Sequence, residues 1–155
     1  MLMPIDPDAR MIRGVHHTAI GVRDMERSLA FYRDLLGLPV LRDWIEDDRQ
    51  IDLIVGLPDA RLRIVHLDAG AGGVVELIEY LSPRGKPLPP DFQQCDFAVT
   101  HLAFRVRGIQ ALYERLRAAG VRFTCPPQER PNGWYATYFF DPNDVTLELL
   151  EEPAA

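Results

Sequence analysis

Two histidines open two similar stretches of this sequence, and their type and spacing point to a shared chemical role. His17 lies in residues 15–22, which read VHHTAIGV, and His101 lies 84 residues later in residues 99–106, which read VTHLAFRV. Because side chains alternate between the two faces of a strand, His16 and His17 are expected to point in opposite directions, and only His17 aligns with His101. The chain is therefore interpreted as a two-fold internal repeat with one histidine opening each copy.

A glutamate inside an apolar run closes each copy. Glu76 lies in residues 75–79, which read VELIE, and Glu148 lies in residues 147–151, which read LELLE. A carboxylate in the middle of a strand is costly unless it is paired or bound to a metal ion. Each histidine or glutamate taken singly is better interpreted as an ordinary core or surface residue. A functional role for the two histidines and two glutamates is favoured because the same residue types recur at corresponding positions of the two copies.

Imidazole nitrogens and carboxylate oxygens together suit divalent first-row metal ions such as Zn, Ni, Co, Mn or Fe. If a pseudo-twofold axis relates the two copies, His17, Glu76, His101 and Glu148 meet at one centre. The sequence thus predicts one metal site and leaves the identity of the ion open. Four other side chains are candidates for lining a cavity, although aromatic core packing is the preferred interpretation for most of them: His66, Trp134, Tyr138 and Phe140.

The elements that must position these residues follow the same order in both copies. In the first copy the patterns predict a strand over 15–22, a helix that begins after Asp24 and ends at Gly37, and strands over 50–55, 61–67 and 74–80. In the second copy they predict a strand over 99–106, a helix over 109–118, and strands over 121–124, 134–140 and 145–150, with a loop over 126–133. The expected fold class is α+β, built from two tandem βαβββ modules.

A proline-rich segment separates the two copies, with four prolines among residues 82–91. The predicted organisation is an N-terminal arm over residues 1–13, a first module over 14–81, a connector over 82–97 and a second module over 98–152. At 155 residues with 47% hydrophobic content, the chain is long enough to bury a core of its own. We expect the two modules to form one domain.

Charge and hydropathy exclude several classes of partner. The net charge is −6 and no run of Lys or Arg occurs, which predicts no nucleic-acid partner and no binding to anionic membranes. No apolar run approaches the roughly 20 residues of a membrane span. The N-terminus carries charges where a signal peptide needs an apolar core, so a cytoplasmic location is expected. In that compartment Cys95 and Cys125 are expected to be reduced thiols.

These stretches together resemble the vicinal oxygen chelate superfamily, which contains glyoxalase I, methylmalonyl-CoA epimerase, extradiol dioxygenases, and the fosfomycin and bleomycin resistance proteins. The matching segments span nearly the whole chain after residue 13: 17–24 (HTAIGVRD), 28–38 (SLAFYRDLLGL), 75–79, 101–106 and 140–151 (FDPNDVTLELLE). The resemblance implies paired βαβββ modules whose sheets curl into a cavity around one metal ion. Together with the apolar strand edges it also favours a homodimer, and it leaves open whether modules pair within a chain or between chains.

Carried over residue by residue, the resemblance implies a ligand set. His17 matches the first-strand ligand of the first module and Glu76 the ligand that ends that module. His101 and Glu148 match the corresponding ligands of the second module. A set of two histidines and two glutamates resembles glyoxalase I and the epimerase, in which two positions of an octahedral ion remain for oxygens of the substrate.

The reaction implied by that set is proton transfer next to a carbonyl group, which predicts a metal-dependent lyase or isomerase. The ion would polarise a carbonyl or thioester oxygen. Glu148, with Glu76 opposite it, would remove the α-proton and return it. The expected substrate is a small molecule with a carbonyl group or vicinal oxygens. The sequence shows no basic cluster for the phosphates of a CoA ester and no sign of glutathione recognition, so it does not identify that substrate.

Four alternatives remain from the same resemblance. An extradiol ring-cleaving dioxygenase uses two histidines and one glutamate, and Glu76 would fill a position that such enzymes leave vacant. Fosfomycin-type thiol transferases, for which the resemblance implies a three-ligand site, are disfavoured because Glu76 supplies a fourth ligand. A drug-binding resistance protein binds its ligand without a metal, in a groove between two subunits, and has no need of two strand carboxylates. A metal-binding member without catalysis is a further possibility.

Overall fold

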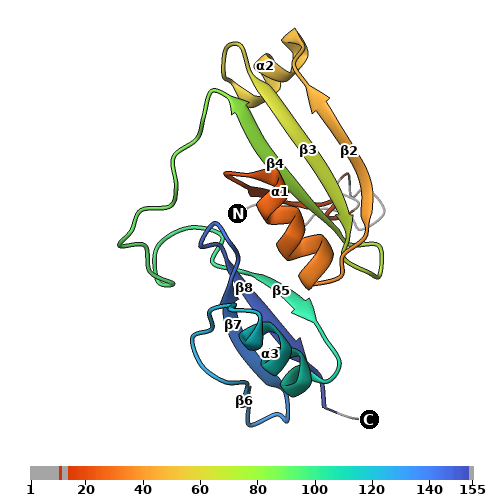
Figure 1. The fold of residues 1–155 in the computed structure, drawn as a ribbon, viewed down its shortest axis with the longest axis vertical. Helices are drawn as coiled ribbons and strands as arrows, with labels where there is room; N and C mark the ends of the chain where they lie inside the picture. The colour runs from red at the N-terminus through yellow and green to blue at the C-terminus, as the bar shows by residue number, and fades with distance from the viewer. Residues whose placement is uncertain (1–10, 12–13, 154–155) are drawn as a thin grey trace, which may run out of the picture.

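The computed structural model describes residue 11 and residues 14–153, and it shows two four-stranded sheets, one in each half of the chain (Figure 1). The first half contains β1 (Thr18–Gly21), α1 (Met25–Leu29) continued by the π-helical segment η2 (Ala30–Leu35), β2 (Val40–Glu46), α2 (Arg49–Val55), β3 (Arg61–Asp68) and β4 (Val74–Ser82). The second half contains β5 (Leu102–Arg105), α3 (Ile109–Ala118), β6 (Gln128–Glu129), β7 (Tyr135–Phe140) and β8 (Thr146–Glu151).

The two sheets have the same topology. Their strand orders are β1-β4-β3-β2 and β5-β8-β7-β6. In each sheet the first and last strands of the module pair in parallel and the other neighbours pair antiparallel. The predicted α+β class with two βαβββ modules is therefore confirmed. The boundaries drawn for the connector and the modules stay predictions, and the arm over residues 1–13 lies outside the described residues except for Met11.

One apolar core joins the two halves. Tyr32 of η2 and Phe139 of β7 are fully buried and belong to the same cluster of side chains as Leu147 and Leu116. Tyr32 donates a hydrogen bond of 2.9 Å to the Oδ2 atom of Asp141, so a polar contact crosses the same junction. Removing a large apolar side chain from water contributes roughly 1.5–3 kcal/mol. The helices thus pack their apolar sides into a core that both sheets share.

Strand alternation places the glutamates on the opposite face from this core. Val75 and Leu77 of β4 belong to the shared core, so Glu76 between them faces the other side of the sheet. Leu147 and Leu149 of β8 flank Glu148 in the same way. In the first sheet a second, smaller cluster covers part of that other face; its buried members are Ile51, Ala60, Leu62 and Ile64.

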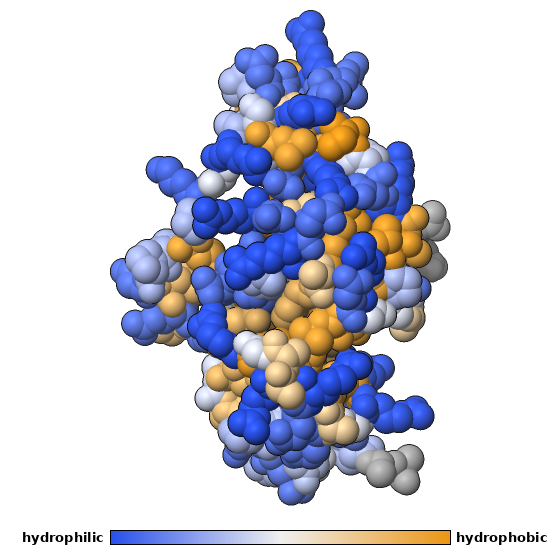
Figure 2. Space-filling model, in the orientation of Figure 1, coloured by the Kyte–Doolittle hydropathy of each residue, from blue (hydrophilic) through white to orange (hydrophobic). Residues whose placement is uncertain are grey.

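The surface of the molecule is mostly hydrophilic. Figure 2 shows mainly hydrophilic residues over the visible face, with hydrophobic residues in the middle of the molecule and others near its top. Cys95 and Cys125 form no disulfide with each other in the structure. Among the described residues, no helix is both long and apolar enough to cross a bilayer.

Two strand predictions are wrong. Residues 50–55 belong to the helix α2, because Asp48 caps its first turn by accepting a 2.8 Å hydrogen bond from the Ile51 N–H. Gly56 ends that helix in the left-handed conformation, at φ 69°. Residues 121–124 form no strand and contribute only a single bridge, between Phe123 and Phe139. The fourth strand of the second sheet is instead the short β6, within the predicted loop over residues 126–133.

Candidate metal site

The first half of the chain brings a glutamate between two histidines. Glu76 lies on β4 directly opposite His66 of β3 in the antiparallel register. His66 Nε2 is 2.5 Å from Glu76 Oε2, and His17 Nε2 is 3.4 Å from Glu76 Oε1. Each carboxylate oxygen of Glu76 therefore faces a different imidazole. The candidate ligand atoms of these three residues all lie within 4.8 Å of one another.

Because Glu76 is buried, its carboxylate needs the two imidazoles beside it. The Glu76 side chain is only 11% exposed, whereas the side chains of His66 and His17 are 19% and 36% exposed. A carboxylate so far withdrawn from water needs a charged or hydrogen-bonding partner. Two imidazoles and one carboxylate also match the donor chemistry of divalent first-row ions. The residues present therefore fit a metal ion that approaches from the side of His17.

His16 does not point away from His17. The Nδ1 atoms of the two histidines are 2.8 Å apart, and their rings make an edge contact with centroids 5.1 Å apart. The expectation of opposite directions fails because β1 begins only at Thr18, so strand alternation does not extend to either histidine. His17 directs Nε2 toward Glu76 while Nδ1 is held by His16.

The second half of the chain forms a matching pair. His101 lies immediately before β5, and its Nε2 atom is 3.1 Å from Glu148 Oε2. Glu148 lies in the middle of β8, opposite Tyr138 of β7, and its side chain is 15% exposed. The Tyr138 ring packs against the His101 ring with centroids 4.9 Å apart. One imidazole and one aromatic ring thus define the surroundings of this carboxylate.

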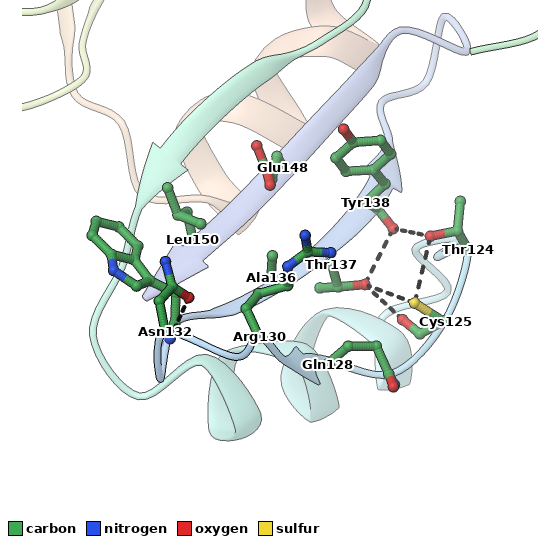
Figure 3. A pocket seen from close by; sticks show the side chains of 11 residues that line it. Thr124, Cys125, Gln128, Arg130, Asn132, Ala136, Thr137, Tyr138, Glu148 and Leu150 are labelled. Atoms are coloured by element: carbon green, nitrogen blue, oxygen red, sulfur yellow. Dashed lines mark hydrogen bonds between the residues drawn. The ribbon is translucent and has the colours of Figure 1, made fainter. Parts of the chain in front are cut away.

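A hollow of about 530 Å³ lies beside Glu148, on the face of the second sheet turned away from the core. Glu148 and Tyr138 project into view from neighbouring strands in Figure 3, and Thr124, Cys125 and Arg130 come from the segments that border them. Thr137 Oγ1 donates a 2.6 Å hydrogen bond to the Cys125 carbonyl, which fastens the bordering segment to β7. Arg130 contributes the one guanidinium in the lining. The hollow can accept a small polar molecule next to the Glu148 carboxylate.

The four predicted ligands thus appear as two pairs. His17 lies with Glu76 and His101 lies with Glu148. Within the part of the chain that the structure describes, no third His, Cys, Asp or Glu joins the second pair closely enough to form a ligand group. The two pairs lie in different sheets, which Figure 1 shows one above the other. A single described chain does not gather all four ligands at one point.

The sequence did not single out His66 as a neighbour of Glu76. Alternation within residues 61–67 sets His66 on the face opposite Val65 and Leu67, and this signal was available. The register that places His66 opposite Glu76 depends on the length of the β3–β4 connection and is not readable from the residue pattern. Trp134 and Tyr138 line the hollow beside Glu148, as cavity residues would.

Comparison with known proteins supports this architecture. The sequence model of the Glyoxalase/Bleomycin resistance protein/Dioxygenase superfamily matches residues 14–149. A 2-epi-5-epi-valiolone epimerase from Actinomyces sp. is 30% identical over 151 residues, which cover 90% of this chain and 80% of that protein. An ethylmalonyl-CoA/methylmalonyl-CoA epimerase from Cereibacter sphaeroides is 29% identical over 113 residues, covering 72% of this chain and 75% of the other.

A solved structure shows the same fold. The crystal structure of a glyoxalase family protein from Bacillus cereus superposes with a TM-score of 0.85 and covers 94% of this chain and 97% of its own. The two sequences are 16% identical. The similarity therefore concerns the arrangement of helices and strands.

Proposed function

The chain belongs to the glyoxalase/bleomycin resistance protein/dioxygenase superfamily, and from this premise we propose that it is a metal-dependent isomerase of the epimerase type. It removes and returns a proton on the carbon next to a carbonyl group. The observation that carries the proposal is Glu148, a strand carboxylate that borders a hollow of about 530 Å³ and is paired with His101 at 3.1 Å. A glyoxalase-type lyase would share this proton transfer and differ in its substrate.

His17, Glu76, His101 and Glu148 are the proposed ligands of one divalent ion. In the described chain each pair lies on the face of its sheet that is turned away from the shared core. We therefore place the complete site between two copies, with the first pair of one chain facing the second pair of the other. This arrangement is a homodimer with two equivalent sites. An ion held there would polarise the carbonyl oxygen of the substrate and increase the acidity of the neighbouring C–H.

Glu148 is the proposed base, with Glu76 as the second acid–base group opposite it. Both oxygens of Glu76 are engaged by imidazoles, at 2.5 and 3.4 Å, whereas Glu148 has one imidazole partner and borders the hollow. Glu148 is thus the carboxylate better placed to accept a proton from a bound molecule. A positioned carboxylate contributes typically 10²–10⁴-fold to such a transfer.

The lining of the hollow favours a small polar carbonyl compound. It contains one guanidinium, Arg130, together with the amides of Gln128 and Asn132 and the hydroxyls of Thr124 and Tyr138. Amides and hydroxyls hydrogen-bond the hydroxyl groups of a substrate, whereas the phosphates of a CoA ester would need several cations. One epimerase relative is named for a valiolone, a hydroxylated ketone. We therefore propose a hydroxylated ketone as the substrate class. The cytoplasm is the location that we propose for the enzyme.

The test is exchange of the α-proton for deuterium, followed by proton NMR. Purified protein supplied with Zn²⁺ or Co²⁺ is incubated in deuterated water with a panel of cyclic hydroxyketones and acyl-CoA esters. We expect exchange with at least one ketone and a loss of 10²-fold or more in Glu148→Gln. Glu152→Gln, which changes an exposed acid near the C-terminal end, is the matched control and should exchange like the wild type. Exchange that survives in Glu148→Gln would remove this carboxylate from the role of base.

A second candidate function rests on the first half of the site. His17, His66 and Glu76 present two imidazoles and one carboxylate, the ligand set of non-haem iron(II) oxygenases. An extradiol ring-cleaving dioxygenase is therefore the alternative. Oxygen uptake with catechols in protein loaded with Fe²⁺, without deuterium exchange in the ketone panel, would favour it. Tight binding of a panel compound without exchange or oxygen uptake would instead indicate a binding protein.

A further inference from the structure

We infer that the first module holds a divalent ion by itself, with His66 of β3 as a third protein ligand beside His17 and Glu76. The inference deepens the metal site of the proposed function and concerns which residues of this chain retain the ion. It makes the first module the part that carries the metal. The pair His101–Glu148 then completes the site without being needed to keep the ion bound.

The first step of the argument is the position of His66 on the sheet. His66 and Glu76 are directly opposite in the β3–β4 register, so their side chains share one face of the sheet. That face is turned away from the shared core, and His17, beside the two residues, is the more exposed of the three side chains, at 36%. An ion can therefore reach the three residues from the side of His17.

The second step is the geometry of the donor atoms. In a tetrahedral site with metal–ligand distances near 2.1 Å, ligand atoms lie about 3.4 Å apart. His17 Nε2 and Glu76 Oε1 are 3.4 Å apart, and all three candidate ligand atoms lie within 4.8 Å of one another. His66 Nε2 and Glu76 Oε2, at 2.5 Å, are closer than two ligands of one ion and are hydrogen-bonded to each other. To admit an ion between the three residues, His66 and Glu76 must give up this hydrogen bond and move their donor atoms apart.

The third step is the support around the two imidazoles. A ligating histidine commonly has its second ring nitrogen held by a neighbouring group, which fixes the orientation of the ring. His17 Nδ1 lies 2.8 Å from His16 Nδ1 while Nε2 faces Glu76. The His66 ring packs edge-on against Trp44, with centroids 4.8 Å apart. Both imidazoles are thus oriented before any ion binds.

The experiment uses the full chain with the second pair removed, in the double variant His101→Ala/Glu148→Gln. We expect this protein to bind about one Co²⁺ per chain by titration and mass spectrometry. Adding His66→Gln should weaken Co²⁺ binding by 10²-fold or more, because losing an outer-shell partner alone costs 10–100-fold. Glutamine keeps a hydrogen-bond donor near Glu76, so a merely supporting role for His66 would be largely preserved.

Proton NMR of the Co²⁺ protein in ordinary water provides a second measurement. Each ligating histidine contributes a strongly shifted, exchangeable ring N–H signal. The double variant should show two such signals, and His66→Gln should leave one. Circular dichroism of the metal-free variants checks that each is folded.

The outcomes separate this inference from the proposed function. Equal Co²⁺ affinity and an unchanged number of shifted signals in His66→Gln would make His66 only a hydrogen-bond partner of Glu76. Binding by the wild type but not by the double variant would overturn the self-sufficient first module and leave the four-ligand site intact. A wild-type protein that binds neither Co²⁺ nor Zn²⁺ would overturn both.

Discussion

Tyr32 illustrates how one residue joins the two halves of the molecule. Its ring is fully buried in the shared core, and its hydroxyl donates to Asp141, which also accepts hydrogen bonds from the backbone N–H groups of Asn143 and Val145. Burial, and then the negative charge of Asp141, raise the pKa of Tyr32 well above its ordinary value of 10.0. The phenol therefore stays protonated in the folded state under conditions in which an unfolded chain begins to lose that proton.

Replacing Tyr32 by Phe should lower the free energy of unfolding by about 1.5 kcal/mol near neutral pH, because a buried hydrogen bond to a charged group is lost. Asp141 keeps its backbone donors, which limits the loss. Urea unfolding followed by tryptophan fluorescence gives the value. Tyr113→Phe, which removes the hydroxyl of another largely buried tyrosine, on α3, is the matched control and should cost less. An equal loss in both variants would show that the Tyr32–Asp141 contact contributes nothing specific.

The raised pKa of Tyr32 also predicts a dependence of stability on pH. The stabilisation is complete below the pKa of the unfolded tyrosine, 10.0, and is lost as the pH rises from there through the folded pKa. Above pH 10 this residue should lower the stability of the wild type by up to about 1.4 kcal/mol per pH unit. Tyr32→Phe should show a correspondingly shallower decline in unfolding free energy between about pH 9 and pH 11.

At the scale of elements, the helix α2 is defined by its two ends more than by its hydrophobic pattern. Asp48 accepts the Ile51 N–H at its first turn, and Gly56 ends it in a conformation that favours glycine. Between them only Ile51 is buried, while Leu53 and Ile54 are 72% and 78% exposed. The capping residues at the two ends therefore determine that this segment is helical, because it buries little apolar surface.

Replacing Asp48 by Ala should destabilise the protein by about 1 kcal/mol, because the cap of α2 is lost. Asp48→Asn retains a side-chain oxygen for the Ile51 N–H and should stay within a few tenths of a kcal/mol of the wild type. The shift of the urea midpoint measures both changes. A midpoint that moves equally in the two variants would indicate that charge, and not capping, is the contribution of Asp48.

The sequence predicted the first, third and fourth strands of each module and missed the second, which is β2 in one sheet and β6 in the other. The helix over residues 109–118 was placed correctly, because its apolar spacing and its partner in the first copy agree. Residues 50–55 read as a strand because isoleucine, leucine and valine dominate them, and a capped turn overrode that preference. The repeat indicated the four residues of the two His–Glu pairs, and their meeting at one centre stays a prediction. The repeat did not indicate His66, because its closeness to Glu76 depends on strand register.

At the scale of the whole molecule, the decisive feature is the direction in which the two sheets face. Their helix-covered sides meet in one core, so the His–Glu pairs lie on the other sides of their sheets. Glutamates that are 11% and 15% exposed on open sheet faces are costly unless something binds them. In the homodimer proposed above, a second copy offers a partner with a complementary pair for each face.

This assembly predicts that two inactive variants restore each other. If each site combines the first pair of one chain with the second pair of the other, a mixed dimer of Glu76→Gln and Glu148→Gln has one site with both pairs intact. After refolding equal amounts together, deuterium exchange should return to about a quarter of the wild-type rate, because about half of the dimers are mixed and each has one working site.

The matched control mixes Glu148→Gln with His101→Ala, which both alter the second pair. No dimer of these two chains contains an intact second pair, so the mixture should stay inactive whichever way the sites are assembled. If both pairs of a site came from one chain, every site in the first mixture would also carry a defect, and refolding would restore nothing. Recovery confined to the Glu76→Gln and Glu148→Gln mixture therefore requires that the site lie between two copies, because only exchange between chains can unite the undamaged halves.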